Sequence, residues 1–372
     1  MNILLVSGPG ISLKEPYNSG IEAFMVSFAN QLVEQGHVVD VVAEKAEDGS
    51  KFKLLNPFLS SSDSSTDSFD PLKEKDQFRN LDVDSYDIIH YNMFYPHLLN
   101  AGLSFHKSSF LTLHSPADKK RIAAYRKLSL LNNITFVAIS ERIKKQWDLA
   151  LGIDIPLINN GINMELWPSN GSGKRDYLLW AARINEEKNV VAAINVAKHL
   201  QLPLKIAGRI ADQHYFDEQV KPHLNSEIQY VGHVTQRELS RLAESASAYL
   251  ATATWQEPFG LAALEMLASG VPVVGFNTAV PPEWEHESIL TTTSLRWQDL
   301  IALVAKSAGI SSATCKEFAL NMNIENMTSN YVKLYRKVLL QEGIIEEGII
   351  EEGATLEKSV KQLVAEQSEI VK

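Results

Sequence analysis

The chain has 372 residues, of which 45% are hydrophobic and 22% are charged. This length and composition predict two globular domains of ordinary size and exclude a fibrous or wholly disordered protein. The net charge of −10 argues against binding to nucleic acid, which requires a basic surface. The single cysteine excludes an intramolecular disulfide and a cysteine metal cluster, and it favours a reducing, cytoplasmic setting.

The N-terminus is predicted to be a buried strand and not a targeting segment. Residues 3–6 are apolar, no basic stretch precedes them, and the run is too short for a signal peptide or a membrane span. A helix over residues 21–35, ended by Gly36, and a strand over residues 38–43 complete a β-α-β unit. Residues 58–76 are rich in Ser and Asp and are predicted to form a long loop.

Continuous apolar runs, rather than alternating ones, follow in the first half of the chain. Such runs indicate strands that are covered on both faces, as in a parallel sheet between two layers of helices. The strands predicted from these runs cover residues 88–91, 110–113, 135–139 and 156–158.

A second series of strands begins after residues 167–173, whose Pro, Ser and Gly content predicts a linker. The strands predicted in this series cover residues 177–181, 204–207, 228–230, 248–251 and 271–275. Two doubly wound α/β domains of this kind bind ligands at the carboxyl ends of their strands.

These patterns divide the chain into four parts. We expect a first Rossmann-like domain over residues 1–165, a second over 166–320, a single amphipathic helix over 321–340 and an acidic tail over 341–372. The tail repeats the sequence Glu-Gly-Ile-Ile-Glu, a five-residue period that matches no helical period. A poorly ordered tail and a docking or oligomerisation segment are the two interpretations of this repeat.

The most informative segment runs from Glu257 to Glu265. Pro258 suits the first position of a helix, strong helix formers follow it, and Gly270 supplies a stop. The N-terminus of such a helix offers free backbone N–H groups, and Gly260 would let a phosphate approach them closely. Eight residues correspond to about 12 Å of helix, a separation that suits a nucleotide diphosphate between two carboxylates.

This segment resembles the Glu-x7-Glu signature of the retaining family 4 glycosyltransferases, which have the GT-B fold. The resemblance implies two Rossmann-like domains that face each other across a cleft, with a C-terminal crossover helix that packs back on the first domain. It also implies that Glu257 approaches the donor sugar and that Glu265 binds the ribose hydroxyls. The amides near Phe259, Gly260 and Leu261 would then meet the diphosphate.

Further segments carry the same resemblance. His114 ends a predicted strand and matches the family's histidine that faces the donor sugar, where an imidazole can bind a hydroxyl or carry part of the developing charge. Arg183 and Lys188 match the family's Gly-Arg…Lys-Gly loop, with Ala182 and Asn189 in place of the glycines. The resemblance implies that both cations neutralise the diphosphate, which a metal ion does in GT-A enzymes.

Two smaller matches and one departure complete the comparison with the family. Gly20 lies at the turn into the first helix and is either a phosphate contact or part of an ordinary β-α turn. Val234 follows a predicted strand that would line the nucleobase pocket. Residues 277–284 lack the glycines that the family has there, which leaves the recognition of the sugar open.

An Asp-x-Asp pair could hold a divalent metal in a GT-A transferase. Asp82 and Asp84 form such a pair, but their polar surroundings before a strand predict a turn. No metal ion and no cofactor are therefore expected.

A basic cluster follows His114 and offers a site for an acceptor. It consists of Lys119, Lys120, Arg121, Arg126 and Lys127, joined by Arg142, Lys144 and Lys145 on the next predicted helix. Such a cluster would bind an anionic acceptor or dock on an acidic lipid surface such as the inner membrane face. A solvated helical face is the alternative.

The sequence and the resemblance together predict a retaining, metal-independent glycosyltransferase of the hexosyltransferase type. It would move a sugar from a nucleotide-sugar, with a UDP-sugar favoured, to a sugar, lipid-linked or other hydroxyl acceptor in glycan, glycoconjugate or glycolipid synthesis. The candidate catalytic residues are His114, Arg183, Lys188 and Glu257, and the candidate donor-binding residues are Gly20, Arg183, Lys188, Val234, Phe259, Gly260, Leu261 and Glu265. A GT-B nucleotide-sugar epimerase or hydrolase and a non-catalytic nucleotide-sugar-binding protein are the alternatives.

Overall fold

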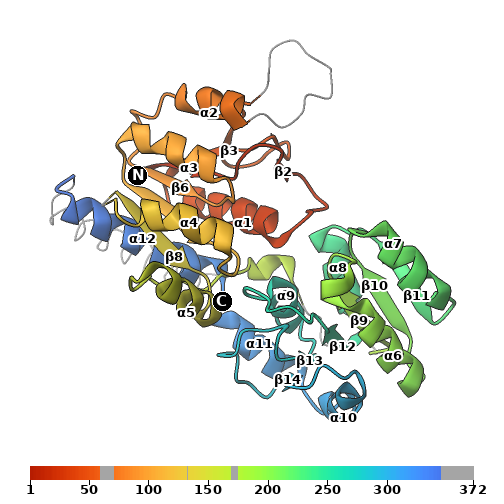
Figure 1. The fold of residues 1–372 in the computed structure, drawn as a ribbon. Coiled ribbons are helices and arrows are strands. Elements are labelled where there is room, and N and C mark those ends of the chain that lie inside the picture. The colour runs from red at the N-terminus through yellow and green to blue at the C-terminus, as the bar shows by residue number, and fades with distance from the viewer. Residues whose placement is uncertain (59–70, 132, 169–174, 345–372) are drawn as a thin grey trace. The chain divides into compact units, whose positions relative to one another are not determined.

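The computed structural model describes residues 1–58, 71–131, 133–168 and 175–344. The chain divides into two compact units, Met1–Met327 and Thr328–Lys372. The first unit contains two six-stranded sheets, drawn in Figure 1 with strands from β1 to β8 in red to yellow and strands from β9 onward in green to blue.

The first sheet has the strand order β5-β3-β1-β6-β7-β8, and all of its pairs are parallel. Its strands are β1 (Asn2–Val6), β3 (Val38–Val42), β5 (Lys53–Leu55), β6 (Ile88–Tyr91), β7 (Ser109–Leu113) and β8 (Ile134–Ala138). Two short strands, β2 (Ser12–Leu13) and β4 (Lys45–Ala46), pair only with each other. The helices of this half are α1 (Gly20–Glu34), α2 (Pro71–Arg79), α3 (Pro96–Gly102), α4 (Lys119–Leu128) and α5 (Glu141–Leu151).

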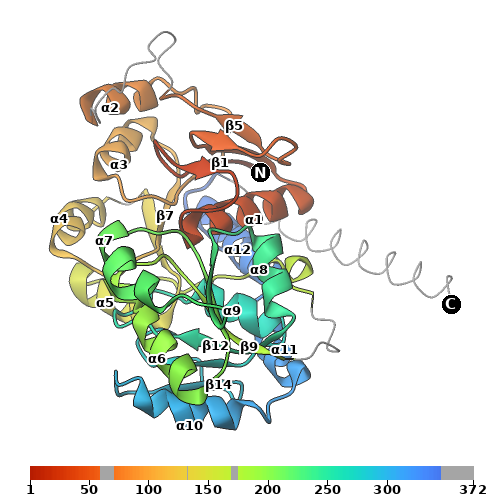
Figure 2. The ribbon, with the colours of Figure 1, turned by 90° about the vertical axis from the view of Figure 1, so that its right-hand side faces the viewer.

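The second sheet has the order β11-β10-β9-β12-β13-β14 and is also parallel throughout. Its strands are β9 (Tyr177–Ala181), β10 (Leu204–Ala207), β11 (Ile228–Gly232), β12 (Ala246–Ala251), β13 (Val273–Phe276) and β14 (Ile289–Thr292). Its helices are α6 (Val190–Leu200), α7 (Gln213–Tyr215), α8 (Gln236–Ala243), α9 (Leu261–Ala268), α10 (Gln298–Ser307) and α11 (Ser312–Leu320). Figure 2 shows α9 next to β12, with which it is in contact.

Short 3-10 or π turns complete the regular structure of the first unit. They are η1 (Leu103–Phe105), η2 (Met164–Leu166), η3 (Glu186–Lys188), η4 (Phe216–Val220) and η5 (Lys221–His223). The last helix, α12 (Ile324–Gln341), crosses from the first unit into the second.

Both sheets have the same topology. If the strands of each sheet are numbered along the chain, both orders read 3-2-1-4-5-6, the doubly wound order of dinucleotide-binding domains. The order reverses between β1 and β6 in one sheet and between β9 and β12 in the other, and ligands bind outside the carboxyl ends of strands at such a point. The predicted fold class, α/β with two Rossmann-like domains, is confirmed.

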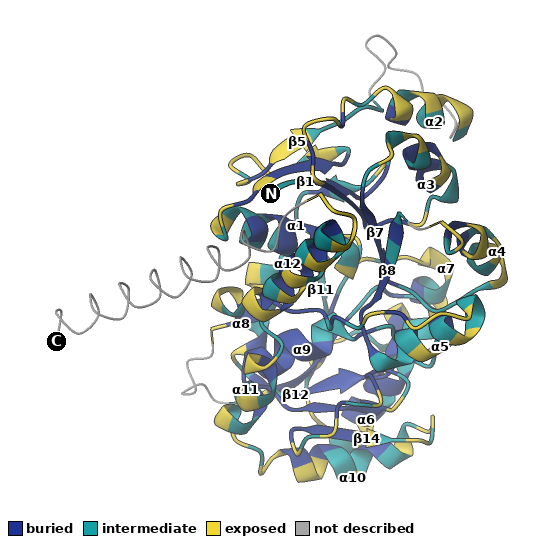
Figure 3. Cartoon of the chain, turned by 90° about the vertical axis from the view of Figure 1, so that its left-hand side faces the viewer, coloured by how far each residue is buried: buried dark blue, intermediate teal, exposed yellow. Residues whose placement is uncertain are grey.

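The strands are buried because their sequences are apolar on both faces. β1 and β9 are runs of Leu, Ile, Val, Ala and aromatic residues, and nearly all of their side chains are buried. Figure 3 shows β7 and β12 in dark blue, while α4 is a mixture of yellow and teal and α5 is mostly teal. The helices thus shield each sheet and leave the strand ends to form a site.

Several predicted elements are wrong or incomplete. The loop predicted over residues 58–76 contains the start of helix α2, and residues 59–70 lie outside the described residues. The strand predicted over residues 156–158 is only an isolated bridge between Ala138 and Leu157. β14 was not predicted, because its four residues Ile289–Thr292 include only two apolar ones.

The chain after the second domain forms a single helix, as predicted, and the first unit contains its beginning. Before α12, Asn323 pairs with Ile162, and the N–H of Gly161 contacts Met327 Sδ at 3.1 Å. Most of the predicted linker and most of the tail repeat lie outside the described residues. No helix among the residues that the structure describes is long and apolar enough to cross a membrane.

Candidate active site

One cavity of about 700 Å³ brings the predicted site residues together. Side chains from both Rossmann-like domains line it, all within the unit Met1–Met327. The predicted residues that line it are Gly20, His114, Arg183, Lys188, Val234, Glu257, Phe259, Gly260, Leu261 and Glu265. The structure therefore places all of them at one site, while their individual roles stay predictions.

The first domain contributes polar side chains from the ends of adjacent strands. Asn92 directly follows β6 and His114 directly follows β7, and the carboxyl ends of paired parallel strands lie at one edge of a sheet. His114 Nε2 lies 2.9 Å from Asn92 Oδ1, so Nε2 carries the proton and Nδ1 is left as an acceptor. Asn92 was not predicted, although its place after a strand is the same signal that identified His114.

His114 is a neutral imidazole. The ring is buried, packs edge-on against Phe24 at 4.8 Å between centroids, and burial lowers its pKa to about 3. A neutral ring exchanges hydrogen bonds with a sugar hydroxyl, which fits the first predicted role. Burial opposes the second predicted role, in which the imidazole carries part of the developing charge.

Gly20 is the first residue of α1 and lies against the second domain. A methyl group at Gly20 would lie 2.9 Å from Leu261 Cδ1, so the glycine allows α1 and α9 to approach each other closely. The hydroxyl of Ser19 caps this helix through the N–H of Ile21 and also donates to the carboxylate of Glu22. This close contact explains the glycine without a ligand, and a phosphate contact stays a prediction.

The second domain contributes an ion pair. The Lys188 ammonium contacts the Glu257 carboxylate and lies 4.8 Å from the centre of the Trp255 ring. Only 11% of the Lys188 side chain and 15% of the Glu257 side chain are exposed. The pair is thus largely desolvated, so either charge would raise the free energy of the folded protein if it lost its partner.

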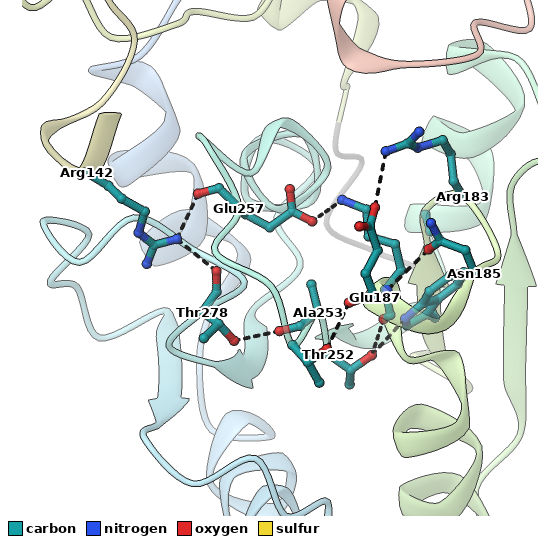
Figure 4. A network of polar contacts seen from close by, with 12 residues as sticks. Arg142, Arg183, Asn185, Glu187, Thr252, Ala253, Glu257 and Thr278 are labelled. Atoms are coloured by element: carbon teal, nitrogen blue, oxygen red, sulfur yellow. Dashed lines mark hydrogen bonds and ion pairs between the residues drawn. The ribbon is translucent and has the colours of Figure 1, made fainter. Parts of the chain in front are cut away.

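The loop that carries Lys188 has Asn189 where the family has a glycine. Asn189 has a left-handed backbone with φ of 52°, a conformation that Asn adopts more readily than most residues and that a glycine would adopt easily. The N–H of Lys188 donates a hydrogen bond to Asn185 Oδ1 at 3.3 Å. Arg183 is more exposed and pairs with Glu187 at 3.4 Å, and Figure 4 shows this pair and the Glu257 side chain on the same network.

Helix α9 begins at Leu261, so the predicted first position, Pro258, is wrong. Gly260 is the N-cap residue with φ of 88°, and this left-handed turn redirects the chain after Phe259. Glu257 therefore lies in a loop before the helix, and the predicted 12 Å helical separation from Glu265 does not apply. No side chain caps α9, so its first N–H groups lack side-chain partners at the cavity.

Glu265 is a buried carboxyl on α9. Gln236 Nε2 donates to its Oε1 at 3.3 Å. Burial raises its pKa to about 7, the Gln236 hydrogen bond lowers it in part, and the nearby Glu15 raises it further. Gln236 was not predicted; it follows the predicted base contact Val234 by two residues, and both line the cavity.

The basic cluster does not form one face. Arg121 pairs with Asp118, its guanidinium lies 4.9 Å from the centre of the Phe94 ring, and Lys144 pairs with Asp148 at 2.8 Å. Arg142, predicted to join the cluster, instead bonds backbone carbonyls of the second domain. Lys119, Lys120, Arg126 and Lys127 of α4 are exposed.

The Asp-x-Asp pair, Asp82 and Asp84, lies at a turn, as predicted, and the N–H of Asp84 donates to Asp82 Oδ1 at 3.2 Å. Within the described ranges, no group of three or more His, Cys, Asp or Glu side chains could hold a metal ion.

Two family models match adjacent parts of the chain. Residues 18–166 match the model described as Glycosyltransferase Family 4, and residues 165–306 match the model described as Glycosyl transferases group 1. Together they cover every strand of the two sheets except β1, and they meet at residues 165–166. The chain has the family domains and the fold of a GT-B glycosyltransferase.

A relative of this GT-B chain is the glycogen synthase of Mycobacterium tuberculosis. It is 34% identical over 133 residues, which cover 33% of this chain and 32% of that protein. The chain thus spans about a third of the length of the curated relatives that it matches.

Solved structures resemble nearly the whole chain. AviGT4, a glycosyltransferase involved in avilamycin A biosynthesis, is 21% identical with a TM-score of 0.67, covering 91% of this chain and 98% of that one. Sucrose-phosphate synthase from Thermosynechococcus elongatus is 15% identical with a TM-score of 0.71, covering 91% and 99%. Anabaena HepE, solved in complex with UDP-glucose, is 17% identical with a TM-score of 0.69, covering 91% and 100%. At these identities the likeness concerns the GT-B fold.

Proposed function

We propose that the chain is a retaining glycosyltransferase that moves a sugar from a nucleotide-sugar to a hydroxyl acceptor without a bound metal. The observation that carries the proposal is the grouping in one cavity of Arg183, Lys188, Glu257 and the uncapped N-terminus of α9. Two cations and free N–H groups suit a diphosphate, and a carboxylate beside them suits sugar hydroxyls.

The ion pair between Lys188 and Glu257 explains how these groups would engage the donor. Each charge of the pair is the partner of the other. A diphosphate would compete for the Lys188 ammonium, and the Glu257 carboxylate would then accept hydrogen bonds from the sugar that follows the diphosphate. Both partners of the pair would therefore exchange one contact for another in the same cavity.

Transfer would follow from the same arrangement. As the bond between the sugar and the diphosphate breaks, negative charge grows on the leaving phosphate, where Arg183, Lys188 and the α9 N–H groups stabilise it. The acceptor hydroxyl attacks the anomeric carbon from the face that the diphosphate leaves, and its proton passes to the leaving phosphate. The configuration at that carbon is then retained.

The donor is proposed to be a UDP-sugar. Support comes from Anabaena HepE, a structural neighbour solved in complex with UDP-glucose. Gln236, the first residue of α8, bonds Glu265, and Val234 lies two residues before it. Both line the cavity, where they would contact the ribose and the base.

A screen of UDP-, GDP- and ADP-sugars tests the proposal. The matching donor should raise the melting temperature, and it should be consumed in the presence of a hydroxyl acceptor, with EDTA leaving the rate unchanged. NMR of the product should show the anomeric configuration of the donor. Glu257→Gln should remove most of the transfer and leave the fold intact.

Other outcomes of the screen favour the alternative functions. Consumption of the donor without any acceptor indicates an epimerase or a hydrolase. Stabilisation without turnover, with any acceptor tested, indicates a binding protein and contradicts the proposal.

A peripheral contact with anionic lipid is proposed for helix α4. Lys119, Lys120, Arg126 and Lys127 are exposed on it, and Leu130, which is 82% exposed, follows directly. Basic side chains next to an exposed apolar one suit an anionic membrane surface. Co-sedimentation with liposomes should rise with anionic lipid content and fall with salt; binding that ignores both would contradict this contact.

A further inference from the structure

We infer that Arg142, a residue of the first Rossmann-like domain, is a positioning residue that holds the donor site of the second domain in its working geometry. The inference rests on the proposed function, because it concerns the loops that would meet the donor. Arg142 lies in the first turn of α5 and does not line the cavity.

The guanidinium of Arg142 donates four hydrogen bonds to backbone carbonyls more than 110 positions away in the sequence. Nη1 lies 2.8 Å from the carbonyl oxygen of Glu257 and 2.8 Å from that of Thr278. Nη2 lies 2.9 Å from the carbonyl oxygen of Asn277 and 2.7 Å from that of Val280. Figure 4 shows the side chain between Glu257 and Thr278.

These carbonyls belong to two loops of the second sheet. One loop precedes α9 and carries Glu257, and the other follows β13 and carries Thr278. The two loops also bond each other directly. The N–H of Glu257 donates to the carbonyl of Thr278 at 2.8 Å, and the Thr278 hydroxyl donates to the carbonyl of Ala253 at 2.6 Å. A planar guanidinium with five donors can join both loops at once, whereas a single ammonium cannot present donors in this spread geometry.

The residue that Arg142 holds by its backbone is the one that pairs with Lys188 by its side chain. The backbone carbonyl of Glu257 bonds Arg142, and its carboxylate bonds Lys188. The same loop leads through Gly260 into the uncapped N-terminus of α9. Movement of this loop would therefore displace the Glu257 carboxylate and the α9 N–H groups together.

The rest of the first turn of α5 lies against the same loops. The Ser140 hydroxyl, which caps α5, donates to the carbonyl of Pro258 at 2.6 Å, and the N–H of Glu141 donates to Glu283 Oε1 at 2.8 Å. The Glu283 carboxylate thus lies at the helix N-terminus, where the helix dipole favours negative charge. The start of α5 therefore makes several hydrogen bonds to these loops, and Arg142 makes the largest number of them.

The competing explanation is that Arg142 only stabilises the fold. Arg175 offers a matched control, because its guanidinium also bonds backbone carbonyls, those of Gly270 at 2.7 Å and Ile310 at 3.4 Å, together with the Ser312 hydroxyl. Arg175 does not line the cavity, and these three hydrogen bonds go to residues outside the two loops. Loss of Arg175 should therefore destabilise the protein without moving the donor site.

The experiment compares Arg142→Ala, Arg142→Lys and Arg175→Ala with the wild type, using the donor that the screen identifies and UDP as the binding probe. Arg142→Ala should lower kcat/KM per folded molecule by roughly 100-fold, as expected for misplaced catalytic groups, and Arg142→Lys by an intermediate factor. Guanidinium chloride at low millimolar concentration, but not NaCl, should restore part of the Arg142→Ala activity. Arg175→Ala should lower the melting temperature and leave kcat/KM within about twofold.

A kcat/KM of Arg142→Ala that stays close to wild type would overturn the inference, and so would an equal loss in Arg175→Ala. If Arg142→Ala does not fold, Arg142→Lys decides: unchanged kcat/KM in that variant is the contrary result. If the wild type turns over no donor, the proposed function fails separately, and UDP affinity then tests Arg142. Weaker UDP binding by Arg142→Ala than by Arg175→Ala supports its role, and equal binding contradicts it.

Discussion

The two sides of the cavity come from sheets of identical strand order but differ in charge. Among the described residues that line the cavity, the Lys, Arg and Glu side chains all come from the second domain: Arg183, Lys188, Arg209, Glu257 and Glu265. The first domain lines it with neutral groups, among them Tyr17, Asn92, Phe94 and the uncharged His114. The same topology thus fixes where a site forms, while the side chains at the strand ends decide what each side binds.

Removal of the Lys188 ammonium from the charged side of the cavity should have the largest effect on donor turnover. Lys188→Ala should lower donor turnover by about 1,000-fold, because it removes a partner of the leaving phosphate and also leaves Glu257 without its counter-ion. Initial rates and UDP affinity measure the effect. Lys198→Ala, an exposed lysine of α6, should stay near wild type; a similar loss in both variants would contradict a specific role for Lys188.

A change on the neutral side should act differently. His114→Ala should lower kcat by about 10- to 100-fold, through a lost hydrogen bond to the sugar, and leave UDP affinity unchanged. Because the pKa of His114 is about 3, the wild-type rate should show no step from this group between pH 5 and pH 8. Loss of UDP affinity in His114→Ala would contradict the expectation that the neutral side binds only the sugar of the donor.

The smallest expected effect is the change of stability with pH that the Glu265 carboxyl causes. Burial raises the pKa of Glu265 to about 7 from its ordinary value of 4.5, so the folded state binds the proton more tightly than the unfolded state. The stability that this proton contributes is complete below pH 4.5 and is lost as the pH rises through 7.

Glu265→Gln should therefore gain stability relative to wild type as the pH rises from 4 to 8, by up to about 3 kcal/mol. Urea denaturation at several pH values measures this change. UDP affinity of the wild type should rise over the same range, because the ionised carboxylate is the better acceptor for ribose hydroxyls. Parallel stability curves for the two proteins would show that Glu265 titrates normally.

Much of the fold was readable because buried parallel strands are continuous apolar runs. The predicted ranges 177–181 and 204–207 are those of β9 and β10. The start of α9 was misplaced because Pro258 is compatible with a first helical turn, and only the backbone shows that Gly260 turns the chain after it. Local sequence signals a helix but does not reveal a left-handed residue at its start.

Long-range partners were the part that sequence could not supply. The sequence groups Arg142 with basic neighbours because they are close along the chain, yet its four partners are carbonyls of another domain. Every residue has a backbone carbonyl, so the sequence does not show which carbonyls accept these hydrogen bonds. Asn92 and Gln236 were missed for a related reason. Each acts on a predicted residue through one side-chain hydrogen bond that depends on the sheet topology.

The ion pair between Lys188 and Glu257 bears on selectivity between ligands and on product release. Because the two charges compensate each other, a small anion that draws Lys188 away leaves Glu257 buried without a partner. The intact donor supplies a partner for each charge, since its diphosphate binds Lys188 and its sugar binds Glu257. The nucleoside diphosphate left after transfer supplies a partner for Lys188 alone. The pair should therefore make the product leave more readily than the substrate, so that the same contact that admits the donor helps to clear the site for the next turnover.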